Sequence, residues 1–290
     1  KLAEISPMFR YEKSGELSGL MRVRMFTLSD AHIFCTPEQA KSQIESALEL
    51  ISFANKVLGL EEGKDYRFRL SLGERVDSRK YFKDDKAWDK AETTLREVLN
   101  EKKKDFYEAV GEAAFYGPKI DIQMKNALGK EETAFTVQYD FVMPKRFDLE
   151  YINDSGEKSE PVVIHRSSIG AFERVIAFLL EHYAGKLPFW IAPVQFSIIP
   201  IADRNSEYAQ KIQKSFLEEG FRVEVNLKSE PMGSKIREAQ LQKIPFMLIV
   251  GDKEQAQQKI ALRSLDDGDL GLSTIGDIVA KVRQLLPKHS

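Results

Sequence analysis

The sequence predicts two domains: an antiparallel sheet with packed helices, then a smaller α/β domain with a mostly parallel or mixed sheet. Before residue 186, strand-like segments come in runs with helices inserted, which is typical of antiparallel sheets with packed helices. After residue 193, strands and short helices alternate, which indicates βαβ units. Residues 186–193 hold two prolines and no regular period, so we expect a linker there. We therefore place the domains at residues 1–187 and 188–290.

The first domain opens with two strand candidates, Met8–Tyr11 and Leu20–Thr27, separated by a polar turn that contains Gly15. Leu20–Thr27 alternates apolar and basic residues, the period of a strand with one polar face. Thr36 is a candidate N-cap followed by Pro37, and apolar residues then recur at helical spacing as far as Gly59.

The remaining elements are predicted from the periodicity of apolar residues and from the turn and capping residues that bound each segment. We expect further strands at Tyr66–Leu72, Ile120–Met124, Phe135–Phe141, Pro161–Ile164, Val194–Ile201, Phe221–Asn226, Phe246–Val250 and Lys259–Arg263. We expect helices at Asp84–Lys103, Ile169–Tyr183, Ser206–Glu219, Gly233–Gln242 and Ile275–Leu286.

Composition excludes several classes of protein. The 290 residues are 42% hydrophobic and 30% charged with a net charge of −2, so any nucleic-acid surface must be a local patch. We find no apolar run long enough for a membrane span and no signal peptide. Cys35 is the only cysteine, which rules out an internal disulfide and fits a cytoplasmic location. P-loop, dinucleotide, H-E-x-x-H and C-x-x-C motifs are absent. Because the chain opens on Lys1, we expect a fragment or a processed chain.

Arg10, Arg22 and Arg24 are the first candidate binding residues. If the first two strands pair antiparallel, Arg10 and Arg22 can point at one face, where guanidinium groups clamp phosphates. Glu12 could accept from the amine of a base, and Phe26 could stack on it. A solvated hairpin with mixed charges explains the same pattern.

His32 and His165 are the second candidates, and two histidines with an acid can hold zinc. Their spacing carries no information, and lone histidines are often ordinary core or surface residues. Cys35 lies three residues after His32, which on a strand places it on the opposite face, so we expect it to be buried and structural.

Other candidates have equally ordinary explanations. Tyr116-Gly117-Pro118-Lys119 can be a connecting turn, and Arg174 an ion-pair or surface residue of an apolar helix. A solvated helix face explains the basic positions of the second domain as well as a binding surface does; these are Lys235, Arg237, Lys243 and Arg263.

Together these segments resemble the threonyl-tRNA synthetase family over essentially the whole chain. Phe9–Glu12 with Gly19–Arg24 resembles class II motif 2, and Thr27–Phe34 resembles the family's threonine-site strand. Phe115–Lys119 and Thr136–Phe141 resemble its inner strands. Pro161–Arg166 followed by Gly170–Arg174 resembles its zinc histidine and class II motif 3. The fold implied is an incomplete class II antiparallel sheet with flanking helices, then an α/β anticodon-binding domain with a mixed sheet.

The resemblance implies roles around ATP. Arg10 would hold the α-phosphate and the threonine carboxylate, and Arg22 the far phosphates. Glu12 would read the adenine amine, with the ring between Phe26 and Arg174.

It also implies roles around threonine. His32 and His165 would be two of three protein ligands of a zinc ion that takes the amine and hydroxyl of threonine. Asp30 would accept from the hydroxyl, and three further residues would line the substrate pocket: Tyr116, Lys119 and Gln138. A hydrophobic pocket separates threonine from isosteric valine by only about 100-fold, whereas a site that ligates the hydroxyl rejects valine harder.

The last hundred or so residues resemble the class IIa anticodon-binding domain. Glu254, Arg237 and Arg263 match positions that contact anticodon bases. Lys243 stands where arginine is common and gives up bidentate pairing.

Three departures stand out. Motif 1, which builds the family's dimer, and the zinc-binding cysteine are absent, and Cys35 does not replace the latter. Met25 stands where glycine is usual, so we expect it to crowd the pocket.

The function implied is ligation of threonine to its tRNA through threonyl-adenylate, with ATP, Mg²⁺ and Zn²⁺, in a protein that is a homodimer at full length. Two alternatives remain: a non-catalytic tRNA-binding fragment or paralogue, and a related class IIa enzyme such as a prolyl-tRNA synthetase. Asp30-Ala31-His32 with His165 favours threonine.

Overall fold

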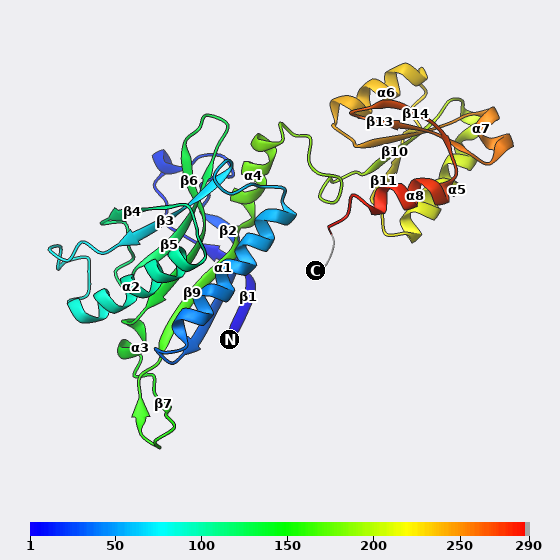
Figure 1. Cartoon of the computed structure of the whole chain (residues 1–290). Coiled ribbons are helices and arrows are strands. Elements are labelled where there is room, and N and C mark those ends of the chain that lie inside the picture. Colours follow the sequence, from blue (N-terminus) through cyan, green and yellow to red (C-terminus); the bar gives the residue numbers. More distant parts are fainter. Residues whose placement is uncertain (288–290) are drawn as a thin grey trace. The chain divides into compact units, whose positions relative to one another are not determined.

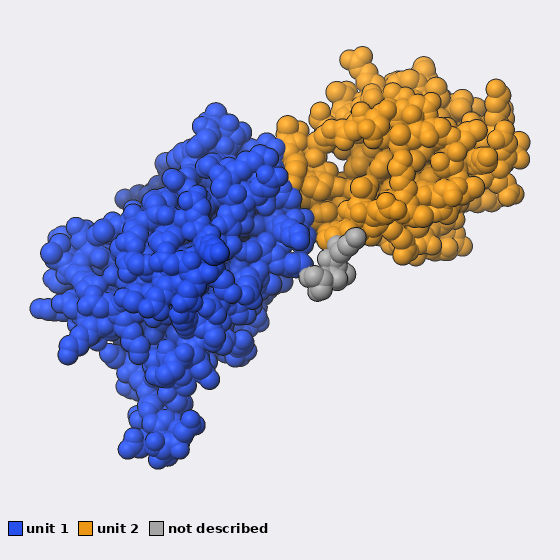
Figure 2. Space-filling model, viewed as in Figure 1, with its two compact units in different colours: residues 1–182 blue, residues 183–290 orange. Residues whose placement is uncertain are grey.

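The computed structural model describes residues 1–287, which divide into two compact units at 182/183 (Figure 2). Each unit has its own sheet, so each is described by itself. Within the described residues, no helix combines the length and the apolar character that a membrane span requires.

A seven-stranded sheet forms the centre of unit 1. Its strand order is β1-β2-β9-β6-β5-β3-β4, and every neighbouring pair is antiparallel except the parallel pair β3–β4. The strands are β1 (Leu2–Phe9), β2 (Met25–Cys35), β3 (Tyr66–Leu72), β4 (Phe106–Val110), β5 (Lys119–Lys125), β6 (Glu131–Asp140) and β9 (Val162–Ala171). Helices α1 (Ala40–Val57) and α2 (Asp85–Glu101) cover one face (Figure 1).

Strand alternation gives this sheet an apolar and a polar face. On β3, Phe68 and Leu70 are fully buried, whereas Arg69 and Ser71 point to the other side. The alternation repeats on β5 and β6, with Ile120, Ile122, Phe135 and Val137 on the apolar side and Lys119, Asp121, Thr136 and Gln138 on the polar side. The helices cover the apolar face, so the polar face is left for a ligand.

The two helices form where sequence periodicity predicts them. On α2 the Asp84 carboxylate accepts the Ala87 N–H at 3.1 Å, an N-cap that satisfies one free donor of the first turn. Its buried stripe includes Trp88 and Leu95, which have at most 1% exposure. On α1 the N-cap is Gln39 rather than Thr36, whose hydroxyl accepts the Gln39 N–H at 3.4 Å.

Three expectations for unit 1 are wrong. The first strand, β1, spans Leu2–Phe9 rather than Met8–Tyr11. Residues 20–24 form a loop rather than the start of a strand, because Arg24 Nε donates to the Glu12 carbonyl at 3.0 Å and folds the segment on itself. Strand β9 continues through Ala171, so the following helix, α4 (Phe172–His182), begins three residues later than expected. Strand β4 and four shorter elements were not predicted. The shorter elements are η1 (Ser14–Glu16), α3 (Met143–Arg146) and the pair β7 (Tyr151–Ile152) and β8 (Lys158–Ser159).

Unit 2 is a five-stranded mixed sheet between helices, as the alternating pattern predicts. Its order is β11-β10-β12-β13-β14, with parallel pairs on both sides of β10 and antiparallel pairs beyond β12. The strands are β10 (Phe196–Pro200), β11 (Val223–Val225), β12 (Phe246–Val250), β13 (Ile260–Ser264) and β14 (Gly268–Ser273). The helical elements are η2 (Asp203–Asn205), α5 (Ser206–Glu218), α6 (Met232–Leu241), α7 (Asp252–Gln257) and α8 (Ile275–Arg283). Residues of α5 and α8 share one apolar core and Ala239 of α6 lies in the other, so helices cover both sheet faces.

Candidate active site

A pocket of about 380 Å³ opens on the polar face of the unit 1 sheet. Its walls are formed by the inner strands β2, β9, β6 and β5, the loop between β1 and β2, the turn before β5 and the first turn of α4. The lining residues are Arg10, Glu12, Leu20, Met21, Arg22, Val23, Phe26, Leu28, Asp30, Tyr116, Lys119, Thr133, Ala134, Thr136, Gln138, His165, Arg166, Ser167, Gly170, Ala171, Glu173 and Arg174. Every residue that the sequence assigns to ATP or to the amino-acid pocket is among them, and His32 is in ring contact with one of them.

The loop between β1 and β2 places an ion pair at one end of the pocket. Arg22 donates through Nε to the Glu12 carboxylate at 3.0 Å, and its Nη2 lies 2.9 Å from the same oxygen. The hydrogen bond and charge of Arg22 lower the pKa of Glu12, so Glu12 is an anion at neutral pH. Both residues were expected to contact ATP separately; here they contact each other, so binding ATP in that way requires the pair to open.

An aromatic platform lies beside this pair. Phe26 is buried in the pocket wall, and the Arg10 guanidinium carbon lies 5.1 Å from the centre of its ring, within cation–π range. Met25, one residue earlier, faces away and is 57% exposed. The expectation that Met25 crowds the pocket is therefore wrong, since neighbouring residues on a strand point to opposite faces.

Arg174 joins three parts of the pocket wall. From α4 it donates through Nε to the Met21 carbonyl at 3.1 Å and through Nη1 to the Thr133 carbonyl at 2.8 Å. Burial, and then the nearby charge of Arg10, lower its pKa, but arginine starts high enough to stay charged. The guanidinium is therefore a fixed, planar cation between the loop and β6.

Tyr116, Gln138 and His165 meet at the other end of the pocket. The Tyr116 hydroxyl donates to the Gln138 side-chain oxygen, and its ring centre lies 5.3 Å from that of His165. Burial, followed by the negative charges of Asp140 and Asp30, raises the pKa of Tyr116 to about 12. Tyr116 is thus a neutral hydrogen-bond donor at neutral pH.

The structure brings His32 and His165 together from neighbouring strands. They are paired in register on β2 and β9, and their ring centres lie 4.6 Å apart. His165 Nε2 lies 2.8 Å from the fully buried carboxylate of Asp140. Asp140 also accepts the N–H groups of Val142 and Met143 at 2.9 Å, which fixes its orientation.

These two histidines do not complete a metal site by themselves. No group of three or more metal-ligating side chains occurs within residues 1–287, whereas zinc sites in proteins use at least three protein ligands. Cys35 is buried, as predicted, and burial raises the pKa of its thiol to about 11, which disfavours the thiolate that binds metals. Residues 1–287 thus fit only part of a zinc site.

Two residues that sequence reasoning missed hold the pocket together. Both carboxylate oxygens of Glu173 accept the Thr27 N–H, at 3.0 and 2.9 Å, which ties α4 to β2. Gly170 has φ +74°, and a Cβ added there would lie 2.3 Å from the Ala134 carbonyl oxygen. A glycine within a regular element was the available signal, because such a glycine often marks close backbone approach.

We expect Gly170→Ala to lower the free energy of unfolding by about 2–5 kcal/mol, from backbone strain plus the clash with β6. Gly156→Ala is the matched control: its φ is +79°, but a Cβ would meet nothing within 4 Å, so only about 1–2 kcal/mol should be lost. Chemical denaturation measures both. Equal losses would show that close packing against Ala134 does not constrain this position.

The four anticodon candidates lie in unit 2. Arg237 is on α6, and Lys243 follows that helix with φ +59°. Glu254 is on α7, where its carboxylate accepts the Gly251 N–H at 2.9 Å, and Arg263 is on β13. The interpretation of these basic residues as a solvated helix face is wrong for Lys235. This residue is 4% exposed, and its ammonium donates to the Pro200 carbonyl at 3.2 Å.

Two family models match the chain, and they divide it in the same way as the two structural units. Residues 1–183 match the model of the tRNA synthetase class II core domain (G, H, P, S and T), and residues 195–285 match the anticodon-binding domain. The chain is 48% identical to the threonine–tRNA ligase of Geobacillus sp. (strain WCH70) over 98% of its own length and 44% of that relative. Against threonine–tRNA ligase 1 of Bacillus subtilis it is also 48% identical, over 97% of its length and 43% of the relative. The chain thus spans less than half the length of these curated relatives.

Solved structures show the same likeness. The RNA binding domain of threonyl-tRNA synthetase from Cryptosporidium parvum aligns with a TM-score of 0.89 and 35% identity, covering 99% of this chain and 70% of that one. The putative threonyl-tRNA synthetase ThrRS-1 from Aeropyrum pernix aligns with a TM-score of 0.82 and 30% identity, covering 98% and 67%. The chain therefore belongs to the class II tRNA synthetases, and within them to the threonyl-tRNA synthetase family.

Proposed function

We propose that this chain is the catalytic and anticodon-binding part of an enzyme that joins threonine to its tRNA by way of threonyl-adenylate. The observation that carries the proposal is a single pocket with an arginine-rich end and a hydroxyl- and imidazole-bearing end. The first end suits a nucleotide and its phosphates, and the second a small polar amino acid.

At the nucleotide end, adenine would lie between the Phe26 ring and the fixed guanidinium of Arg174, with Glu12 accepting from its amine. Arg10 and Arg22 would contact the phosphates once the Arg22–Glu12 pair opens. Mg²⁺ would accompany the phosphates of ATP.

Activation would begin when a carboxylate oxygen of threonine attacks the α-phosphorus of ATP. A phosphorus–oxygen bond forms to the amino acid, and the bond to the departing pyrophosphate breaks. Arg10 would hold the attacking and attacked groups together and offset the charge that builds between them. The tRNA ribose hydroxyl would then attack the threonyl carbonyl, and AMP would leave with the bonding electron pair.

At the amino-acid end, Tyr116, Lys119, Gln138 and Asp30 would surround threonine. His32 and His165 would be two zinc ligands, with a further ligand from outside residues 1–287, because these residues offer no third. No catalytic step above depends on zinc.

For the tRNA, we propose that Arg237, Lys243, Glu254 and Arg263 contact the anticodon, which the match of residues 195–285 supports. For the complete polypeptide we propose the homodimer of the family and a cytoplasmic location. The proposal that this unit contacts another protein surface is supported by edge strand β1. Three large apolar side chains on this strand are 66–73% exposed: Leu2, Ile5 and Phe9.

Threonine-dependent ATP–pyrophosphate exchange tests the proposal, with valine and serine in parallel. In the complete polypeptide we expect exchange with threonine and at least about 100-fold less with valine. In this chain by itself we expect weak exchange or none. Binding of tRNA without exchange, in the complete polypeptide as well as in this chain, would instead support the non-catalytic alternative.

A further inference from the structure

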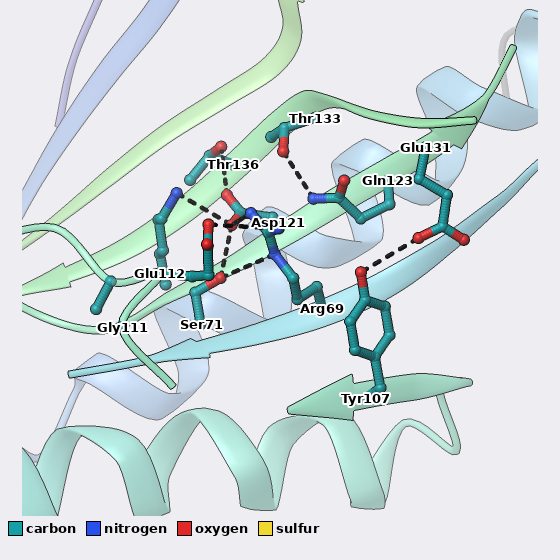
Figure 3. Close-up of polar contacts among 12 residues, drawn as sticks. Arg69, Ser71, Tyr107, Gly111, Glu112, Asp121, Gln123, Glu131, Thr133 and Thr136 are labelled. Atoms are coloured by element: carbon teal, nitrogen blue, oxygen red, sulfur yellow. Dashed lines mark hydrogen bonds and ion pairs between the residues drawn. The ribbon is translucent and has the colours of Figure 1, made fainter. Parts of the chain in front are cut away.

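A second polar cluster lies on the polar face of the same sheet (Figure 3), and two of its residues also line the pocket. Its centre is Asp121 on β5, whose side chain is fully buried. Oδ2 accepts from Arg69 Nη2 at 2.8 Å and from the Ser71 hydroxyl at 2.7 Å. Oδ1 accepts from the Thr136 hydroxyl at 3.0 Å. The Lys119 ammonium lies 3.0 Å from Oδ2.

Two cations contact the Asp121 carboxylate, whereas a single ion pair would be enough to stabilise the fold. Arg69 and Asp121, directly opposite each other on β3 and β5, already form a bonded pair. Arg69 also reaches Glu112, at 3.5 Å, so its charge has a second, exposed counterpart. Lys119 is an additional cation on the same carboxylate, and its side chain is 18% exposed. Partly burying this ammonium has a desolvation cost that packing alone does not explain.

Lys119 and Thr136 belong to both the cluster and the pocket, since both line the pocket. Lys119 is paired in register with Gln138, so the two side chains lie on the same face, next to Tyr116. An ammonium has three N–H donors, and the contact with Asp121 uses one. Two remain for an oxygen of a bound molecule.

We propose that Asp121 is a positioning residue of this active site: it holds the Lys119 ammonium at the amino-acid end of the pocket. This inference rests on the proposed function. A free lysine side chain samples many rotamers and loses that conformational entropy when a substrate fixes it. If the side chain is already fixed before the substrate binds, the binding free energy no longer includes this entropy loss. Asp121 does not touch the substrate and acts through Lys119.

The test compares two ligands of the full chain, ATP and the non-hydrolysable adenylate analogue 5′-O-(N-threonylsulfamoyl)adenosine, by calorimetry. Asp121→Asn should weaken the analogue about 100-fold, the cost of misplacing a binding group by about 1 Å, and leave ATP affinity unchanged. Lys119→Met should weaken the analogue similarly. The double variant should then be no weaker than Lys119→Met, because Asp121 has nothing left to position.

Glu92→Gln is the matched control. Glu92 is also buried, binds Arg75 at 2.9 Å and accepts the Gly73 N–H at 3.1 Å, but it is not part of the pocket lining. The substitution Glu92→Gln should reduce thermal stability and leave the affinities for ATP and for the analogue unchanged.

Asp121→Glu keeps the ion pairs and covers the case in which Asp121→Asn fails to fold. Its analogue affinity should lie between those of wild type and Lys119→Met, with ATP affinity unchanged. Equal losses for ATP and analogue, additive losses in the double variant, or wild-type affinity in both Asp121→Glu and Lys119→Met would overturn the inference. A complete wild-type polypeptide that binds ATP but not the analogue would instead count against the proposed function.

Discussion

Replacing Arg174 by alanine is expected to lower the affinity of the chain for ATP by about 30-fold, because a desolvated contact between a guanidinium and an aromatic ring is worth about 2 kcal/mol. Two losses combine. The adenine loses one of its two flanking planes, and the carbonyls of Met21 and Thr133 lose the bonds that hold the loop against β6. Calorimetric titration with ATP measures the effect. Arg174→Lys should not restore it, because an ammonium offers no plane for stacking.

Arg222 provides a matched control in unit 2. Its guanidinium also donates to two backbone carbonyls, those of Ala192 at 2.9 Å and Trp190 at 2.7 Å. Arg222→Ala therefore removes a comparable pair of charge-assisted bonds away from the pocket, and it should lower thermal stability without changing ATP affinity. Unchanged ATP affinity in folded Arg174→Ala would show that Arg174 only supports the wall of the pocket.

Periodicity predicted the long elements well and failed where contacts between distant segments decide the backbone. Strand Tyr66–Leu72 has the bounds expected, since its alternation matches a sheet with one apolar face. Residues 20–24 alternate equally well but form a loop, because Arg22 and Arg24 bind Glu12 within that loop. Strand β9 continues beyond Ile164 because β6 pairs with it as far as Ser167 and β2 as far as Ala171, which no local pattern reveals.

The same limit applies to the site. Resemblance to a family placed ten residues that line the pocket, but it assigned them roles in a bound complex. It did not show that Glu12 and Arg22 pair with each other, or that Met25 points outward. The Asp121 cluster was also missed, because its members come from residues 69, 71, 119, 121 and 136 and meet only when β3, β5 and β6 align.

The histidine pair decides how much of a zinc site this chain provides. A metal-bound histidine usually donates its other ring N–H to a carboxylate, which fixes the ring and strengthens the ligand. Asp140 occupies that position at His165: it is fully buried, lies 2.8 Å from Nε2 and is itself held by two backbone N–H groups. This leaves Nδ1 of His165 for an ion shared with His32. Two imidazoles are one ligand short of the three that zinc enzymes use.

We therefore expect the chain by itself to hold zinc weakly, and the complete polypeptide to bind one equivalent with His165 among its ligands. In the complete polypeptide, His165→Ala should abolish stoichiometric zinc and threonine binding while tRNA binding persists. Asp140→Asn should weaken zinc by about 10- to 100-fold, the usual effect of losing the carboxylate behind a histidine ligand. His182→Ala is the matched control, since His182 lies on α4 and is not among the pocket-lining residues. This variant should keep both zinc binding and threonine binding. Elemental analysis and calorimetry with threonine provide the measurements. If His165→Ala binds threonine as the wild type does, the histidines have no role in recognising the substrate, and Asp140 serves only to cap α3.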